Sequence, residues 1–216
     1  MSACPTTSPD LPTDLRPEPR PELLSEAVDI RPLAEHDTHL VSEVFEGLSP
    51  LSRFLRFHTP TPRLSRTLVQ ALAAVSDGAR GAFVALDGGR AVGLAQWARD
   101  PGCATRAELA VAVVDAHQGH GVGRCLLGAL AEAMPAQGIH ELVCVVHSEN
   151  RLVAQALRRA GAHRDPDGSL VIRVAHARSA LRAAPKGKAP ASAVVLPWAD
   201  AVPRPRTPAG GEQQRR

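Results

Sequence analysis

The chain has 216 residues, with 25 Lys or Arg, 22 Asp or Glu, a formal net charge of +3 and 44% hydrophobic residues. It contains no apolar run of about eighteen residues, which excludes a membrane-spanning helix. Its four cysteines form no Cys-x-x-Cys pair and its nine histidines do not have metal-ligand spacing, so we expect no metal site and a reducing, cytoplasmic location.

The two ends of the chain differ in charge and lack apolar periodicity. Residues 1–26 are rich in proline and carry five acidic and two basic residues, whereas residues 179–216 carry two acidic and seven basic residues. We predict disordered tails around one domain at 27–178, because such segments cannot bury enough apolar surface to offset their ordering entropy. The basic tail is compatible with a nucleic acid or an acidic partner, but its lack of interleaved aromatic residues favours a solvated tail.

The first half of the expected domain combines one strand with three helices. Residues 27–33 are predicted to form a strand, and residues 36–48 a helix with apolar side chains at every fourth position. Ser49 is expected to cap a second helix over 51–57. A third helix is expected over 64–75.

Three strands follow, and the third carries an acidic residue among small ones. Residues 81–86 and 91–98 are separated by Asp-Gly-Gly, which is typical of a hairpin turn. On the next strand, 106–114, alternation puts the larger aliphatic side chains on one face and Glu108 with two alanines on the other. A carboxylate beside small residues leaves room for a ligand and can act as a general base. The alternative is a structural role in which Glu108 pairs with a base such as Arg106.

A turn with three alternate glycines separates this strand from the next helix. The sequence from Gln118 to Arg124 is Gln-Gly-His-Gly-Val-Gly-Arg. Its backbone N–H groups can converge at the helix start on a phosphate or pyrophosphate. A P-loop is excluded because Arg-Cys follows the last glycine, and a Rossmann fingerprint is excluded because its third glycine is missing. A turn without a ligand is the structural alternative.

The remaining segments complete a mixed α/β domain. Residues 139–147 are predicted to form a second buried strand, Asn150 opens a helix that ends at Gly161, and residues 169–174 form a closing strand. Two of the cysteines lie in apolar runs and are expected to be buried thiols. These are Cys125 and Cys144.

The glycine turn and the Asn150 segment resemble the GNAT superfamily of N-acetyltransferases. Gln118, Gly121 and Gly123 match the Gln-x-x-Gly-x-Gly pattern of its acetyl-CoA pyrophosphate loop. Asn150 matches the start of the family's later Asn…Gly-Phe segment, although Ala162 replaces the usual Phe.

The segment Leu-Ser-Pro-Leu-Ser-Arg-Phe-Leu-Arg-Phe at 48–57 is similar to a subgroup of the superfamily. That subgroup includes the acetyltransferase domains of bacterial protein-lysine acetyltransferases. The resemblance covers about residues 27–178, and in the fold this helical region shapes the acceptor side of the cleft. Arg53 and Arg56 therefore either contact an acceptor or pair with nearby carboxylates.

The resemblance implies a mostly antiparallel central sheet flanked by helices and transfer of an acetyl group from acetyl-CoA. The acceptor is a primary amine, of a small molecule or a protein lysine, that attacks directly in a ternary complex. Glu108 is the expected catalytic base. The expected cofactor-binding residues are Val113, Val114, Gln118, Gly119, His120, Gly121, Val122, Gly123, Arg124 and Asn150.

One feature departs from the family pattern. Many members carry a tyrosine in the last helix that can protonate the leaving thiolate, but the matching residue here is Leu157 and the chain has no tyrosine. The thiolate leaves unaided or with water, or the domain is a non-catalytic acetyl-CoA sensor. The sequence leaves the acceptor and the oligomeric state open.

Overall fold

The computed structural model describes residues 28–75 and 78–183, so the predicted tail at 1–26 and most of the one at 179–216 lie outside the described residues. No helix in the described ranges is long and apolar enough to cross a membrane. The elements are, in order, β1 (Asp29–Pro32), α1 (Thr38–Glu46), α2 (Pro50–Phe57), α3 (Arg66–Ala73), β2 (Arg80–Asp87), β3 (Arg90–Asp100), β4 (Cys103–Val113), η1 (Asp115–His117), α4 (Val122–Ala133), η2 (Met134–Gln137), β5 (Glu141–Cys144), α5 (Arg151–Arg159), β6 (His163–Arg164), β7 (Leu170–Arg173) and α6 (Val174–Ala183).

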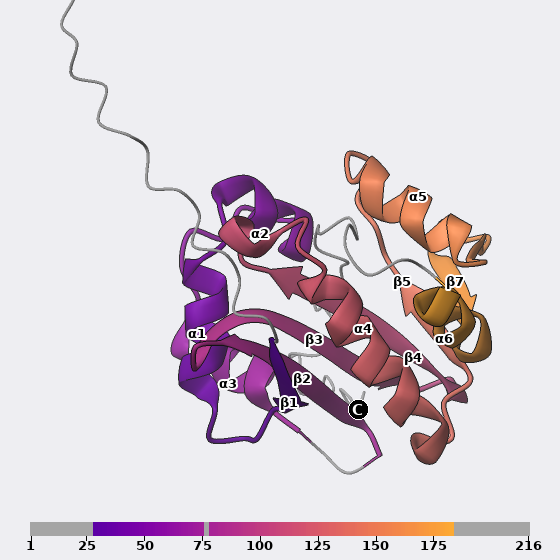
Figure 1. Ribbon diagram of the computed structural model, residues 1–216, viewed down its shortest axis with the longest axis horizontal. Helices are drawn as coiled ribbons and strands as arrows, with labels where there is room; N and C mark the ends of the chain where they lie inside the picture. The colour runs from indigo at the N-terminus through magenta and orange to yellow at the C-terminus, as the bar shows by residue number, and fades with distance from the viewer. Residues whose placement is uncertain (1–27, 76–77, 184–216) are drawn as a thin grey trace, which may run out of the picture.

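The described strands form one seven-stranded sheet in the order β1-β2-β3-β4-β5-β7-β6. Neighbouring strands are antiparallel except for β4 and β5, which are parallel and are connected through α4. Figure 1 shows α4 lying across the sheet, with α5 and α6 towards its β5–β7 side. This arrangement confirms the predicted mixed, mostly antiparallel sheet flanked by helices.

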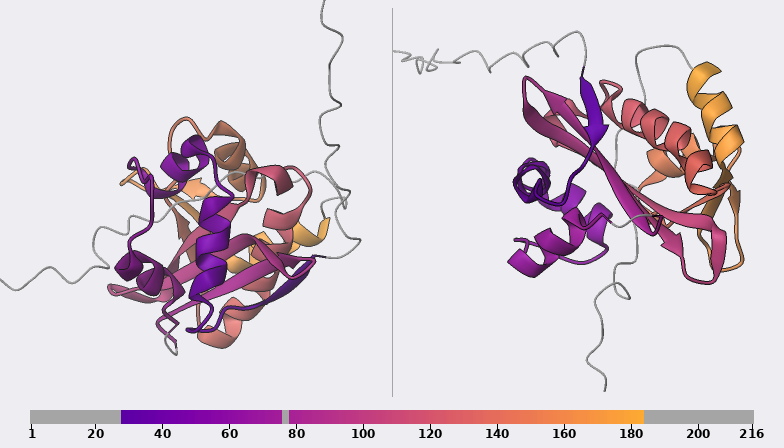
Figure 2. Two further views of the ribbon diagram at one scale, coloured as in Figure 1. Left: turned by 90° about the vertical axis from the view of Figure 1, so that its left-hand side faces the viewer. Right: turned by 90° about the horizontal axis from the view of Figure 1, so that it is seen from below.

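Helices cover both faces of the sheet. Figure 2 shows α1, α2 and α3 on one side and α4 and α6 on the other. Alternation along β4 divides its side chains between the two cores as predicted: Leu109 and Val113 pack in the core under α4, whereas Ala112 packs in the core under α1 and α3. Glu108 therefore belongs to the face that α1, α2 and α3 cover.

The β2–β3 hairpin has the turn that its sequence predicts. Gly88 and Gly89 both have positive φ, at 55° and 83°, which fits a two-residue turn. Gly81, at the start of the same hairpin, is required for packing. A Cβ on Gly81 would lie 2.7 Å from Nε1 of Trp97, its partner on β3, so the indole occupies the space that a side chain would need.

Ser49 caps α2, as predicted, through a hydrogen bond from the Ser52 N–H to the Ser49 hydroxyl at 3.2 Å.

The last described helix, α6, was not predicted, and it runs past the expected domain end at residue 178. Glu132 on α4 forms ion pairs with Arg178 and Arg182 on α6, the latter at 2.9 Å. These contacts tie the helix to the domain.

The two cysteines in apolar runs have different surroundings. Cys144 on β5 is buried, as predicted, and burial raises the pKa of its thiol to about 12. The expectation for Cys125 is wrong, because this residue is exposed. It lies two turns from exposed Glu132 on the outward face of α4, whereas Val122 and Leu126 face the core.

Candidate functional site

The strands β4 and β5 part directly after Glu108. The ladder between them joins Arg106, Ala107 and Glu108 to Glu141, Leu142 and Val143. Beyond this point β4 stays paired with β3 as far as Val113, so its other edge presents backbone N–H and C=O groups that β5 does not bind in the described ladder. Half-buried Glu108 thus lies where a strand-edge binding site begins.

The glycine turn lies at the other end of this free edge and leaves a helix N-terminus open. Gly121 is the N-cap of α4 with φ 91°, and Gly119 has φ 78°. A Cβ at either position would meet no atom within 4 Å. The N–H groups of Val122 and Gly123 begin the helix without a side-chain cap, which is the arrangement that favours an anion. His120 is exposed on the same turn.

Gln118 holds the turn in place through its side chain. Its Nε2 donates to the Val113 carbonyl at 3.0 Å and lies 3.2 Å from Oδ1 of Asp115 and 3.4 Å from the Ser52 hydroxyl. The side-chain amide is therefore occupied within the protein. Gln118 and Val113 are both among the predicted cofactor-binding residues, and the hydrogen bond between them fixes the position of the turn.

The segment between β4 and the turn is also bound to the start of α2. Asp115 donates its N–H to the Gly47 carbonyl at 3.1 Å, and its Oδ1 accepts the Ser49 N–H at 3.3 Å. Val114 donates its N–H to the Val92 carbonyl at 2.9 Å, which prolongs the β3–β4 pairing. The glycine turn and α2 are thereby fixed relative to each other.

Two predicted cofactor residues make structural contacts with their side chains. The Arg124 guanidinium donates to the Leu181 carbonyl at the end of α6. Asn150 is buried, and its Oδ1 caps α5 by accepting the Val153 N–H at 3.4 Å. Each also makes a further interaction.

Arg106, which the sequence offered as a structural partner for Glu108, has other acidic neighbours. Its guanidinium lies 3.1 Å from a Glu141 oxygen and 3.2 Å from an Asp165 oxygen, and hydrogen bonding to Glu141 raises the pKa of Arg106. These ion pairs fasten β4 to β5 and to the β6–β7 turn. Glu108 has an interaction of its own as well.

The two arginines of α2 differ sharply in their surroundings. Arg53 donates to the carbonyls of Phe45 at 3.3 Å and Pro62 at 2.9 Å, and its guanidinium lies over the Phe45 ring. Arg56 is 3% exposed, and its Nη2 donates to Oε1 of Gln96 on β3 at 2.6 Å. The described residues give neither guanidinium a carboxylate within 4.0 Å.

A ring cluster joins α2 to the loop after β5. The His147 ring lies 4.9 Å from the Phe54 ring and 5.3 Å from the His58 ring, both measured between centroids. Burial, with the nearby charges of His147 and Arg56, lowers the pKa of His58. The cluster brings α2 beside the end of β5, close to the point where β4 and β5 part.

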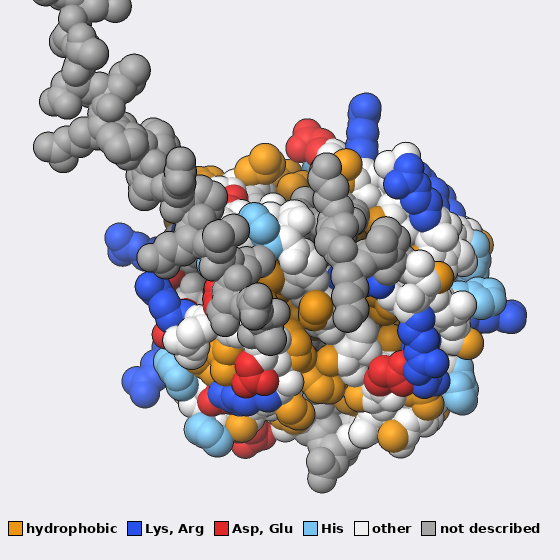
Figure 3. All heavy atoms as spheres, in the orientation of Figure 1, with side chains coloured by type: hydrophobic (Ala, Val, Ile, Leu, Met, Phe, Trp, Pro, Cys, Tyr) orange, Lys and Arg blue, Asp and Glu red, His pale blue; other side chains and the backbone are white. Residues whose placement is uncertain are grey.

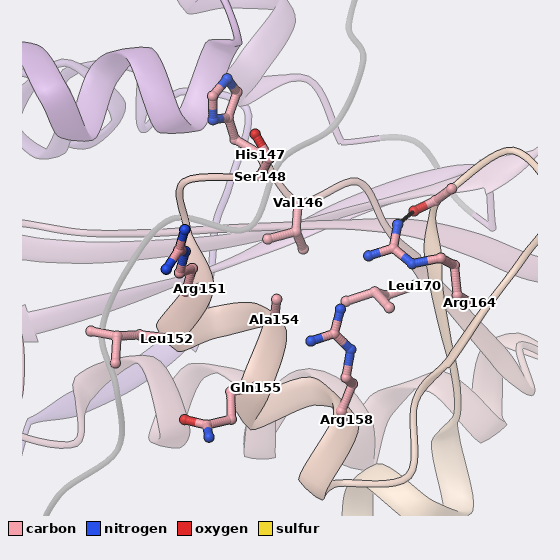
Figure 4. A pocket seen from close by; sticks show the side chains of 11 residues that line it. Val146, His147, Ser148, Arg151, Leu152, Ala154, Gln155, Arg158, Arg164 and Leu170 are labelled. Carbon is pink, nitrogen blue, oxygen red and sulfur yellow. Dashed lines mark hydrogen bonds between the residues drawn. The ribbon is translucent and has the colours of Figure 1, made fainter.

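A cavity of about 500 Å³ lies on the other side of His147, between α5 and the β6–β7 turn. Arg151, Arg158 and Arg164 line it around an apolar floor that includes Leu170. Figure 4 shows Arg158 and Arg164 extending toward the same space beside Leu170, while His147 points away toward α2. Figure 3 shows basic side chains spread over the α5 and α6 side of this face. The cavity wall therefore favours an anionic guest.

Sequence reasoning missed Gln96, which is buried and positions Arg56. Its Nε2 donates to the Leu72 carbonyl at 2.7 Å, so Oε1 is turned toward the guanidinium. A signal was available, because a glutamine within an otherwise apolar strand needs a partner. The partner itself, 40 residues earlier in the chain, had no local sequence signal.

Comparison with known proteins identifies the family. The model of the acetyltransferase (GNAT) family matches residues 44–162. A curated relative, acetyltransferase PA5475 of Pseudomonas aeruginosa, is 31% identical over a 148-residue alignment that covers 65% of this chain and 78% of the relative. The chain therefore belongs to the GNAT acetyltransferase family.

Solved structures agree with this assignment. The GNAT domain of S. lividans PAT is 28% identical with a TM-score of 0.63, over 68% of this chain and 90% of that domain. YncA of Salmonella typhimurium, a putative acetyltransferase solved with its cofactor acetyl-CoA, is 18% identical with a TM-score of 0.56, over 69% of this chain and 95% of that one. The latter likeness concerns the fold alone.

Proposed function

We propose that this protein transfers the acetyl group of acetyl-CoA to a primary amine by direct attack in a ternary complex. The pyrophosphate binds at the open N-terminus of α4 and the pantetheine arm runs along the free edge of β4. The acetyl group then lies beside Glu108, which acts as the general base.

The observation that carries this proposal is the layout of β4. Glu108 stands where β5 departs, and the glycine turn follows the far end of the same strand. Glu108 and Val113 are five positions apart, so about 17 Å of strand separates the base from the turn. The two amides of pantetheine can hydrogen-bond along this edge as an added strand would.

The chemistry requires a base because an amine is protonated at neutral pH. Glu108 takes a proton from the ammonium, directly or through water, and the freed nitrogen attacks the thioester carbonyl. The C–N bond forms and the C–S bond breaks, which releases CoA thiolate; the second proton that the nitrogen loses on becoming an amide passes to this thiolate through water. A thiol of pKa ~8.5 is a good leaving group, so water suffices to protonate it.

The second candidate is an acetyl-CoA sensor without turnover. The observation that favours it is Leu157, which replaces the family's tyrosine and is buried in the core with Val153. A leucine cannot donate a proton to the thiolate.

Release of free CoA thiol separates the two functions. Acetyl-CoA is mixed with the protein and with a panel of small amines, aminoglycosides and lysine peptides. The proposal expects thiol release that depends on an added amine, with one acetyl group appearing on that amine per thiol. Acetyl-CoA binding by calorimetry without thiol release for any amine would favour the sensor.

A further inference from the structure

Arg56 is a buried cation without a buried anion. Its Nη2 is bound to the neutral Gln96 amide, and its Cζ lies 4.9 Å from the centroid of the Phe57 ring. Its Nη1 is buried and has no hydrogen-bond partner among residues 28–75 and 78–183. Burial lowers the pKa of Arg56 to about 10, which still leaves the guanidinium charged at neutral pH.

Such a group has an unfavourable energy in the free protein. A buried charge is stabilised by an opposite charge and by hydrogen bonds to its donors, and the described residues give Arg56 one hydrogen bond, from Nη2, and no opposite charge. Gln96 and Phe57 nevertheless hold the guanidinium in one orientation. A planar guanidinium that keeps a donor unused is suited to a carboxylate, which can accept from it in a bidentate manner.

The position of Arg56 relates it to Glu108. Gln96 on β3 is opposite Ala110 on β4, and Ala98 is opposite Glu108. Gln96 and Glu108 are therefore diagonal neighbours on one face of the sheet, ~7 Å apart at their backbones. The guanidinium bound to Gln96 thus lies on the same face of the sheet as the proposed base.

A second buried ring nitrogen lies at the C-terminal end of the same helix. His58 has a left-handed backbone, with φ 53°, and its Nε2 is buried without a hydrogen-bond partner. Its ring is held against His147, and it follows Arg56 by two residues. Two buried nitrogen atoms that have no hydrogen-bond partner among the described residues, on the helix that covers this face of the sheet, point to a polar ligand.

We propose that the acceptor is a small amine that also carries a carboxylate, as an amino acid does, and that Arg56 binds this carboxylate. This inference rests on the proposed acetyl transfer. Glu108 faces the ammonium end of the acceptor and Arg56 faces its anionic end, with Gln96 positioning the guanidinium. A lysine side chain of a protein would bring an ammonium but no carboxylate, and would leave the Arg56 charge uncompensated.

Matched acceptors test the proposal. Each of a series of amino acids with increasing amine–carboxylate spacing is compared with its carboxamide and with the amine that lacks the carboxylate. We expect at least one acid to exceed its carboxamide at least tenfold in kcat/KM. Equal rates for every acid and its carboxamide, or a lysine peptide as the preferred acceptor, would overturn the proposal.

Variants of Arg56 test whether this residue causes the preference for the acid over its carboxamide. Arg56→Met should bring the ratio of acid to carboxamide close to one, and Arg56→Lys should restore part of it. Arg53→Met is the matched control, because Arg53 on the same helix binds backbone carbonyls, and it should keep the wild-type ratio. A ratio that survives in folded Arg56→Met would contradict the role of Arg56.

A binding measurement keeps this inference distinct from the acetyl transfer on which it rests. If no amine is acetylated, calorimetry with the CoA-loaded protein still compares each acid with its carboxamide. Tighter binding of the acid, lost in Arg56→Met, supports the carboxylate site even though the proposed transfer has failed. Equal binding of both would overturn the site.

Discussion

The two ends of the candidate site consist of different chemical groups, backbone at one end and side chains at the other. At the glycine turn, Gly119 and Gly121 leave open space and the backbone of α4 provides the donors. At the proposed acceptor end, side chains from separate segments are brought together, with Arg56 on α2 hydrogen-bonded to Gln96 of β3. One end is an exposed backbone surface, and the other is a buried arrangement of side chains.

The difference explains what each end can recognise. Backbone N–H groups at a helix start bind any phosphate, so this end suits a cofactor that many proteins share. Side chains fixed by burial discriminate among ligands, because an unmatched polar group inside the protein is costly. The backbone end is therefore suited to the donor and the side-chain end to the choice of acceptor.

The largest expected effect concerns Glu108, which lies between the two ends. Glu108→Gln keeps the shape and removes the basic oxygen, so turnover should fall by ~10²–10⁴-fold. Acetyl-CoA affinity should stay within about twofold, because the glycine turn is unaltered. The loss should shrink as pH rises, since more of the amine is then already neutral. Steady-state kinetics from neutral to alkaline pH, with calorimetry, measure both quantities.

The control for Glu108 is Glu141→Gln, which removes a nearby carboxylate that is bound to Arg106 on the same pair of strands. This variant should lose stability but keep turnover within a few-fold of the wild type. Wild-type turnover in Glu108→Gln across the pH range would contradict its role as base. A parallel loss of acetyl-CoA binding would indicate a structural role instead.

At the backbone end, Gly121→Asp should weaken acetyl-CoA binding ~100-fold, or about 2.7 kcal/mol. The added carboxylate would lie where we propose that the pyrophosphate binds, and two like charges ~4 Å apart repel by about 1–4 kcal/mol in water or at a protein surface. Gly121→Asn is the matched control, because Asn has nearly the same shape and also tolerates a positive φ. Calorimetry on both variants gives the comparison, and equal affinities would show that no phosphate binds at this turn.

A structural carboxylate should behave differently from Glu108. Asp37 is buried before α1, where Arg31 at 2.6 Å and the Ala34 N–H at 3.0 Å lower its pKa from 3.8 to about 2. A lowered pKa stabilises the fold above pH ~4, and this contribution is lost as pH falls toward 2. Asp37→Asn should therefore reduce the free energy of unfolding by about 2 kcal/mol at pH 7 and hardly at all near pH 2.

Urea unfolding at several pH values tests this prediction, with Asp29→Asn as a control on the neighbouring strand β1. An Asp37→Asn deficit that persists near pH 2 would show that its cause is packing and not charge. Acetyl-CoA affinity at pH 7 should be unchanged in the folded variant, because Asp37 is part of neither end of the site.

Removal of the tails should have the smallest effect on stability and on acetyl-CoA binding. We propose that residues 28–183 fold and bind acetyl-CoA alone, and we expect a chain cut to this range to melt within a few degrees of the full chain. A chain cut after residue 178 should melt at a lower temperature, because it lacks Arg182 and the Leu181 carbonyl that Arg124 contacts. Calorimetric melting of the three chains, with acetyl-CoA titrations, checks the order. Loss of binding on removal of the tails would mean that they form part of the site.

The sequence predicted most of the fold because its signals are local. Hairpin glycines, the Ser49 cap and the alternation around Glu108 depend on residues close together in the chain. The helix α6 was missed because its pairing with Glu132 spans 46 and 50 residues. Cys125 was misplaced because an apolar run does not say which face of a helix points inward.

The candidate site divides in the same way. The glycine turn was predicted from its spacing, whereas the contact of the Gln118 side chain with the Val113 carbonyl was not predicted. The contact between Arg56 and Gln96 depends on how α2 lies over β3, which no short stretch of sequence encodes. Sites built from backbone are readable from sequence, and sites built from distant side chains require coordinates.

The indole that fills the space beside Gly81 also makes this domain suited to optical measurement. The chain has two tryptophans and no tyrosine, and Trp97 alone lies within the described residues. Trp97 is 7% exposed and is opposite Leu109, the residue next to Glu108. In a chain limited to residues 28–183, emission excited at long ultraviolet wavelengths comes from this one buried indole. Its fluorescence therefore reports directly on the β3–β4 pairing beside the site, without labels and without a background from other residues.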